Sequence, residues 1–198
     1  MATARAKRLP PEERRSHLIE AALAVFAERG YAGTELADVA AAAGVGRPLI
    51  YHYFENGKED LYVAVLERAW GDLVDRLEID PERGRSMLGT NLPAYLDLIE
   101  AGDPSVAVIR GSRRLEGGRV SEVTRGAGRL LAAGIAANQL GMEDPPADVL
   151  ASLLGFLAFF ESLVEEWRGG RIERADVERI VSRALPAIAD AAVEPQRG

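Results

Sequence analysis

Arg47 is the side chain in this sequence whose type and position most directly suggest a chemical role. Its guanidinium group can donate two parallel hydrogen bonds to a guanine edge, or it can contact a phosphate. Leu49 can touch the methyl group of a thymine. Both residues follow Gly46 at the start of a segment that predicts a helix, and the start of such a helix can enter the DNA major groove. The segment therefore predicts a DNA-reading element.

Two short helices joined by a tight turn are needed to position these residues. The first is expected to begin at Thr34, whose hydroxyl can cap the free N–H groups of the first turn. Gly44 is expected to end it, because glycine accepts the left-handed conformation that closes a helix. The second is expected to begin around Pro48. Proline lacks an N–H, and it fits the first turn because the N–H groups there have no helical partner. The pattern predicts a helix-turn-helix at about residues 34–54, a corner that also occurs in helical proteins that do not bind DNA.

A preceding helix is expected to complete a small three-helix core. Pro10 and Pro11 open it and Gly30 ends it, while His17 is expected on its surface. Apolar residues recur at helical spacing along all three helices. Those predicted to pack together are Leu18, Ala22, Val25, Phe26, Leu36, Val39, Ile50 and Phe54.

Five short motifs occur in order around these helices. They are G-Y-x-G-T at Gly30–Thr34, D-V-A at Asp38–Ala40, A-G-V at Ala43–Val45, Y-H-Y-F at Tyr51–Phe54 and K-E-D-L at Lys58–Leu61. Over roughly residues 11–66 the sequence thereby resembles the N-terminal domain of the TetR family of bacterial transcriptional regulators. Two departures are notable. Gly46 stands where the family usually has Ser or Thr, and one extra residue separates Phe54 from Lys58.

The resemblance implies which residues contact DNA. Thr34 and Lys58 resemble phosphate-anchoring positions, and Tyr51 and His52 resemble positions that contact the backbone or the bases. In the alternative interpretation Thr34 only caps its helix, and Tyr51 and Tyr53 only pack. The residues expected to bind DNA are Thr34, Gly46, Arg47, Pro48, Leu49, Tyr51, His52, Tyr53 and Lys58.

Composition excludes several other kinds of chemistry. The 198 residues include no cysteine and two histidines, so thiolate sites are excluded, and we expect no metal site and no cofactor. Residues 1–58 hold 8 Lys or Arg against 7 Asp or Glu, whereas residues 59–198 hold 16 against 24. A disordered basic arm at residues 1–9 can attract phosphates, although a solvated tail is the alternative. No apolar run approaches the roughly 18 residues that span a bilayer, and no signal peptide is evident, so a cytoplasmic protein is expected.

The rest of the chain is expected to form a larger helical domain. A long helix from Lys58 or Glu59 carries an apolar seam that includes Val74 and ends near Pro81. Further helices are expected around residues 88–99 with a kink at Pro93, at 105–110, at 120–140, between Pro146 and Gly169, and at 175–192.

The last two helices are expected to form a homodimer interface. Apolar residues cover more than half the circumference of the first of them, which exceeds what packing within one domain requires. Two such helices from each subunit make a four-helix interface. The expected interface residues are Leu150, Leu153, Leu154, Leu157, Val177, Ile180, Val181, Ala184 and Ile188.

An effector cavity is expected between the helices of residues 86–142 and 150–167. Its aromatic side chains suit a small apolar or aromatic compound, and an arginine-rich stretch that includes Arg110 could instead bind an anion or form a solvated face. Each aromatic residue can also be ordinary core. The candidates are Met87, Tyr95, Arg110, Phe156, Phe159, Phe160 and Trp167.

These observations predict an all-α protein with a helix-turn-helix DNA-binding domain at residues 1–57 and an effector-binding and dimerisation domain at 58–198. The expected function is a homodimeric repressor of operator DNA that a small effector releases. The alternatives are a helical carrier that does not bind DNA and, with less support, an all-helical enzyme, for which the sequence offers no catalytic set. A gel shift with promoter-region DNA separates them.

Overall fold

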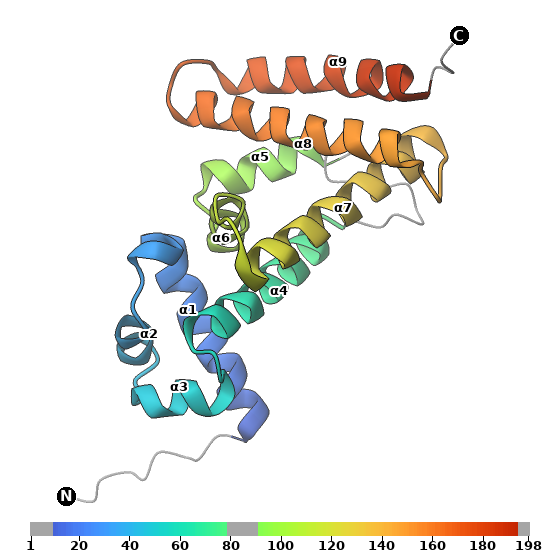
Figure 1. Cartoon of the computed structure of the whole chain (residues 1–198). Coiled ribbons are helices and arrows are strands. Elements are labelled where there is room, and N and C mark those ends of the chain that lie inside the picture. Colours follow the sequence, from blue (N-terminus) through green and yellow to red (C-terminus); the bar gives the residue numbers. More distant parts are fainter. Residues whose placement is uncertain (1–9, 79–90, 194–198) are drawn as a thin grey trace, which may run out of the picture. The chain divides into compact units, whose positions relative to one another are not determined.

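The computed structural model describes residues 10–78 and 91–193, and within these ranges every regular element is a helix, as expected for the all-α class (Figure 1). The helices in chain order are α1 Pro11–Gly33, α2 Leu36–Ala42, α3 Arg47–Tyr53, α4 Lys58–Arg76, α5 Leu92–Glu100, α6 Pro104–Ser112, α7 Gly118–Leu140, α8 Ala147–Arg168 and α9 Arg174–Val193. The basic arm at residues 1–9, together with Pro81, Met87 and Leu88, lies outside the described residues.

The chain divides into two compact units. The head comprises residues 1–72 with 103–121, and the body comprises residues 73–102 with 122–198. This division differs from the expected boundary at residue 57, because most of α4 and all of α6 belong to the head. The reason is packing, since α1 lies against α6 as well as α2. The Tyr62 hydroxyl also donates to the Val108 carbonyl oxygen at 3.2 Å, which ties α4 to α6.

The core of the head is the predicted one. Leu18, Ala22 and Phe26 from α1 are almost completely buried, as are Val39 and Ile50 from the next two helices. An aromatic cluster extends this core into α4. The Tyr62 ring meets the Phe26 ring edge-on at 4.7 Å and the Tyr31 ring at 4.8 Å between centroids.

The start of α2 differs from the prediction. Glu35, not Thr34, is the N-cap, because its side chain and that of Asp38 each accept a hydrogen bond from the other's backbone N–H. Thr34 is fully buried, and its hydroxyl donates to the Gly30 carbonyl oxygen at 2.8 Å. Gly30 has φ 69° and interrupts α1, so its carbonyl lacks the usual helical donor and Thr34 supplies one.

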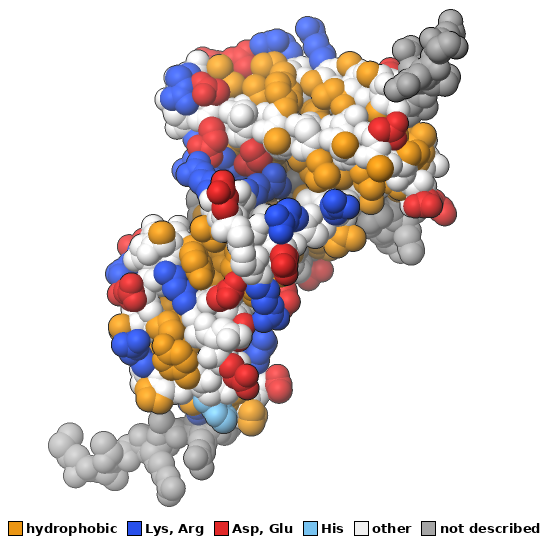
Figure 2. Space-filling model, viewed as in Figure 1, with side chains coloured by type: hydrophobic (Ala, Val, Ile, Leu, Met, Phe, Trp, Pro, Cys, Tyr) orange, Lys and Arg blue, Asp and Glu red, His pale blue; other side chains and the backbone are white. Residues whose placement is uncertain are grey.

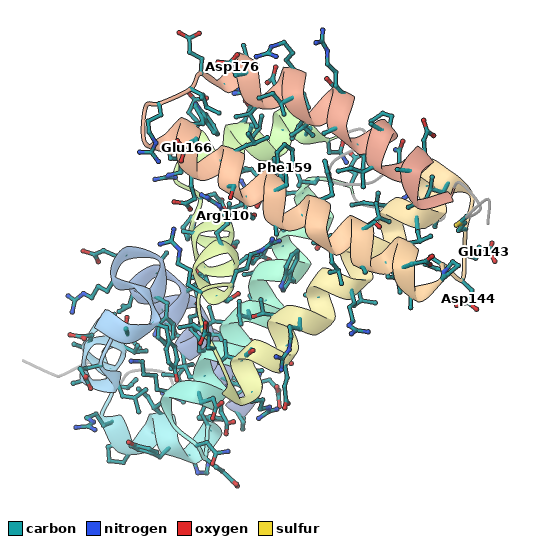
Figure 3. The ribbon with its side chains drawn as sticks, turned by 45° about the horizontal axis from the view of Figure 1, so that its top comes forward. Arg110, Glu143, Asp144, Phe159, Glu166 and Asp176 are labelled. Carbon is teal, nitrogen blue, oxygen red and sulfur yellow. The ribbon has the colours of Figure 1, made fainter. Side chains whose placement is uncertain are left out.

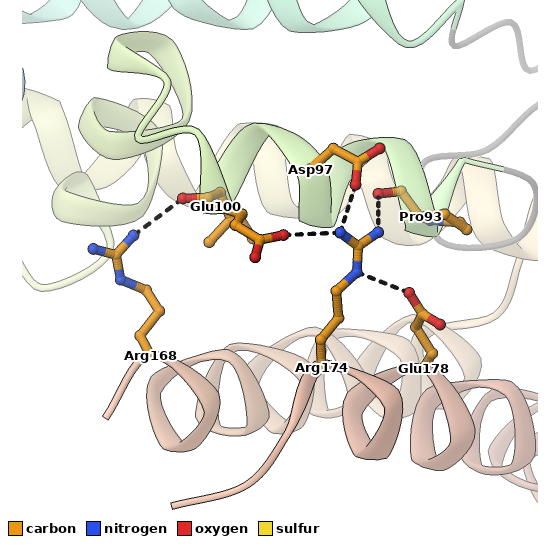
Figure 4. Close-up of polar contacts among 7 residues, drawn as sticks. Pro93, Asp97, Glu100, Arg168, Arg174 and Glu178 are labelled. Atoms are coloured by element: carbon orange, nitrogen blue, oxygen red, sulfur yellow. Dashed lines mark hydrogen bonds and ion pairs between the residues drawn. The ribbon is translucent and has the colours of Figure 1, made fainter. Parts of the chain in front are cut away.

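The body is organised around the pair α8 and α9, which lie along each other (Figure 1). Arg174, at the start of α9, ties this pair to α5 (Figure 4). Its guanidinium pairs with Asp97 at 2.5 Å and with Glu100 and Glu178 at 3.0 Å, and it also donates to the Pro93 carbonyl oxygen. These carboxylates, Asp97 above all, raise the pKa of the guanidinium.

Three expectations about the body helices need correction. Pro93 lies in the first turn of α5, where its missing N–H costs nothing, so it begins the helix and does not kink it. Val74 is 40% exposed and is not part of the α4 seam. No apolar run near 18 residues was expected, but among the residues that the structure describes, one helix, α8, is long and apolar enough to span a membrane by length and composition, with a mean hydropathy of 1.8 over 18 residues. Packing against α9 accounts for one side of α8 within the body.

The bond between Tyr62 and Val108 provides a test of the head's architecture. Burial raises the pKa of the Tyr62 hydroxyl, so it remains a donor at neutral pH. Tyr62→Phe should lower the free energy of unfolding by about 1 kcal/mol, since it removes one buried hydrogen bond without a change of shape. The exposed Tyr51→Phe, measured by urea denaturation in parallel, should be within about 0.5 kcal/mol of wild type. Equal losses for the two variants would contradict this packing.

Candidate nucleic-acid interface

A glycine turn sets the direction of α3. Gly44 has φ 64°, a left-handed conformation that ends α2, and the Val45 N–H then donates to the Ala40 carbonyl oxygen at 2.9 Å. Gly46 is the N-cap of α3, with an extended backbone that any residue can adopt and no side-chain cap. A Cβ at Gly46 would meet only Pro48, at 3.5 Å. The departure from Ser or Thr at this position therefore removes a cap but leaves the turn intact.

The two faces of α3 differ sharply. Ile50 and Phe54 are 0% and 2% exposed and hold the helix against the head's core. Leu49 and Tyr53 are half-buried. The rest of the helix surface presents Arg47, Pro48, Tyr51 and His52 to solvent. The structure thus brings four of the predicted contact residues onto one exposed surface.

Some positive side chains of the head form ion pairs with aspartates, and others do not. Arg29, Arg68 and Arg119 form ion pairs with Asp38, Asp72 and Asp60. Four other cations form no ion pair with any residue in the described ranges. They are Arg14, Arg15, Arg47 and Lys58, at the starts of α1, α3 and α4. Uncompensated charge around α3 creates the positive potential that attracts phosphates.

The longer loop before Lys58 closes as a compact turn. The Asn56 backbone N–H donates to Asp60 at 2.9 Å, and this bond lowers the pKa of the Asp60 carboxyl. Gly57 has φ 61°, and an added Cβ would lie 3.0 Å from the Tyr51 ring, so glycine is favoured there. As a result α4 still begins at Lys58, as expected. The ammonium of Lys58 lies 4.5 Å from the centroid of the Tyr31 ring.

Thr34 differs from its expected place, and His17 makes a contact that was not predicted. The Thr34 side chain, being fully buried and bonded to Gly30, is not presented to a phosphate, so we remove it from the candidate contacts. His17 is exposed as expected, but its Nε2 also lies 3.1 Å from the Ala43 carbonyl oxygen and links α1 to the end of α2.

The candidate effector residues are only partly brought together. Tyr95, Phe156 and Phe160 are buried in the body, with the Tyr95 and Phe160 ring centroids 5.9 Å apart. Phe159 on α8 is 37% exposed, Trp167 is half-buried, and Arg110 on α6 belongs to the head (Figure 3). Met87 lies outside the described residues.

The body also contains a cleft at a place that was not predicted. Its volume is about 580 Å³, and it is open to solvent. It lies between the start of α5, the end of α7 and α9, so α8 is not among its walls. Among its lining residues are Leu92, Gln139, Val181, Ser182 and Leu185.

The candidate interface residues on α8 and α9 fall into two groups. Leu153, Leu157, Val177 and Val181 are at most 3% exposed, because α8 and α9 pack together within the subunit. These four side chains are not available to a partner subunit, so the prediction that they lie in the dimer interface is corrected. The others remain half-buried, namely Leu150, Leu154, Ile180, Ala184 and Ile188.

No group of three or more His, Cys, Asp or Glu residues suited to holding a metal ion occurs in the described ranges, 10–78 and 91–193.

Comparison with known proteins gives consistent matches. Residues 18–65 match the family described as bacterial regulatory proteins, tetR family. A solved tetR-family transcriptional regulator from Streptomyces coelicolor is 30% identical, with 93% of this chain and 83% of that chain covered and a TM-score of 0.71. The HTH-type transcriptional activator FasR of Mycolicibacterium smegmatis is 38% identical over 102 residues, 48% of this chain and 45% of FasR.

The chain thus spans less than half the length of this curated relative. The structure of AibR in complex with isovaleryl coenzyme A and operator DNA shares the fold, at 20% identity and a TM-score of 0.59, over 87% of this chain and 98% of that chain.

The exposed position of Arg47 predicts a role in reading sequence. Arg47→Ala should cost about 1–3 kcal/mol per half-site on a DNA site selected by the wild-type protein. It should cost much less on random-sequence duplex, because base contacts favour one sequence and phosphate contacts do not. Fluorescence anisotropy on both DNAs measures the difference. An equal loss on both DNAs would assign Arg47 to positioning and contradict base reading.

Proposed function

Because the chain belongs to the TetR family of bacterial regulatory proteins, we propose that it is a cytoplasmic DNA-binding transcriptional regulator. In this proposal it is a homodimeric repressor that a small effector releases from its operator. The observation that carries the proposal is the exposed face of α3, which presents Arg47, Tyr51 and His52 to solvent.

DNA binding has a direct test against the alternatives. The protein should shift DNA taken from upstream of its own coding region and of neighbouring genes, in the presence of excess random competitor at about 150 mM salt. A helical carrier or an enzyme would shift none of these fragments. If the protein shifts none of these fragments and binds no sequence in a DNA library, the proposal of DNA binding is wrong.

Dimerisation is supported by the apolar surface that α8 leaves uncovered. Only 33% of its most apolar 18-residue window is buried within the chain. Hydrophobic side chains gather over α8 and α7 in the space-filling view (Figure 2). Ala151, Ala158 and Phe159 are exposed on α8, which adds to the half-buried residues named above. If this surface packs against the same surface of a second copy, α8 and α9 of the two subunits form a four-helix interface. The two-fold symmetry then places two recognition helices in successive major grooves.

An effector is supported by the aromatic residues in the body. Tyr95, Phe156 and Phe160 are buried in the body, with the Tyr95 and Phe160 rings close together, and this apolar interior suits an apolar group on a ligand. The complex of AibR with isovaleryl coenzyme A makes short acyl thioesters the first class to test. Such a ligand would act by preferring a conformation that fits the operator poorly, and only to the extent of that preference.

The dimer interface can be tested with a charge on α8. Phe159→Arg should convert the dimer to a monomer at micromolar concentration and weaken DNA binding in parallel, because it places an uncompensated cation in an apolar interface. Val74→Arg is the matched control, since Val74 is 40% exposed and Phe159 is 37% exposed. Analytical ultracentrifugation reports the assembly state. If Phe159→Arg sediments as wild type does, α8 is not the interface.

The effector class has its own prediction. Isovaleryl coenzyme A and longer acyl thioesters should lower affinity for DNA about 5- to 150-fold, and DNA should lower affinity for the thioester by the same factor. Free coenzyme A, which lacks the apolar group, is the control and should have little effect. Gel shifts and calorimetry measure the two sides of this coupling. Identical responses to free and acylated coenzyme A would exclude recognition of the acyl group.

A further inference from the structure

We propose that Arg15 is a phosphate contact held in place by the ring of Phe54, at a position outside the helix-turn-helix itself. The inference rests on the proposed function, because it requires DNA on the exposed face of α3. It extends that interface to α1 and gives the buried Phe54 a second role beside its place in the core.

The contact joins two helices that are distant in sequence. The Arg15 guanidinium carbon lies 5.3 Å from the centroid of the Phe54 ring, within the range of a cation–π interaction. Phe54 is the C-cap of α3 and is 2% exposed, so its ring is fixed by the core. Arg15, in the first turns of α1, is half-buried. The ring therefore holds the cation beside the carboxyl end of α3.

The position of Phe54 on α3 shows where Arg15 lies relative to DNA. At about 100° per residue, the exposed residues Arg47, Pro48, Tyr51 and His52 occupy one arc of the helix. Phe54 lies at one edge of this arc, close to the direction of Arg47 but two turns further along. When such an arc faces the floor of a major groove, the phosphates run along the flanks of the helix. A cation over Phe54 is thus placed for a phosphate and not for a base edge.

The chemistry of arginine suits this place. Arg15 forms no ion pair with a residue in the described part of the chain, so its charge is available. A guanidinium that lies over an aromatic ring keeps N–H donors along its edge, and these can bind two phosphate oxygens at once. The ring also restricts the side chain before DNA arrives, which reduces the entropy lost on binding.

Salt dependence separates a phosphate contact from a packing role. The experiment measures affinity for a short random-sequence duplex and for a selected site by anisotropy, between about 50 and 200 mM KCl, for the full-length protein. Arg15→Ala should lower affinity for both DNAs by the same factor, and should reduce the slope of log K against log salt by about 0.9 per lost phosphate, or about twice that for a dimer.

Two further variants complete the design. Arg15→Lys keeps the charge but loses the planar group, so its slope should stay near that of wild type while its affinity falls between the wild-type and alanine values. Arg29→Ala is the matched control, because Arg29 also lies on α1 but pairs with Asp38, and its slope should equal that of wild type. Thermal melts of all variants report any loss of packing.

The outcomes are distinct. If Arg15→Ala lowers the melting temperature but leaves the slope unchanged, Arg15 only covers Phe54, and the inference fails while DNA binding stands. If its loss of affinity is confined to the selected site, Arg15 reads bases and the phosphate assignment is wrong. If the wild-type protein binds neither DNA at the lowest salt, the proposed function fails with it.

Discussion

The burial of Ile50 and Phe54 in the core of the head is the constraint on which the function of the head depends. These side chains are 0% and 2% exposed, and they fix both the axis of α3 and its rotation about that axis. Because the helix has only seven residues, it could not hold its conformation alone. With one face fixed, Arg47, Tyr51 and His52 must project from the other. The reading surface is therefore a consequence of the core, and the glycine at position 46 costs only a cap.

Charge pairing within the head is the second feature on which DNA binding depends. The protein carries a net charge of −7, which by itself would repel DNA. In the described part of the head, however, aspartates neutralise Arg29, Arg68 and Arg119. Arg14, Arg15, Arg47 and Lys58, which form no ion pair there, lie at the starts of α1, α3 and α4. Local potential, and not net charge, governs the approach of a phosphate within a Debye length of about 8 Å. An acidic chain can therefore carry a DNA-binding surface.

Local signals in the sequence predicted the helices well. Pro11, Pro48 and Pro104 each lie in the first turn of a helix, and Gly44 has the left-handed conformation that ends one. These effects depend on one residue and its neighbours, so they can be recognised without a fold. The cap at Thr34 was wrong because Gly30 breaks α1 with φ 69°, and the Thr34 hydroxyl bonds the carbonyl oxygen that this break leaves without a helical donor.

Features that depend on distant partners were not predictable. Apolar periodicity on α8 and α9 indicated which residues are buried, but it did not show that Leu153 and Val181 are buried within the same subunit. The two compact units differ from the expected division because α6 packs on α1, some 80 residues earlier in the chain. The contact between Arg15 and Phe54 likewise joins residues that no motif connects.

Selection of binding sites from a random-sequence DNA library tests the central claim most directly. If α3 reads the major groove and two copies act together, the enriched sequences should be two-fold symmetric, with half-site centres one helical turn or a multiple of it apart. Double replacement of Arg47 and Tyr51 by alanine should abolish the enrichment. A library that shows no enrichment with the wild-type protein, or the same enrichment with the double variant, would contradict the account.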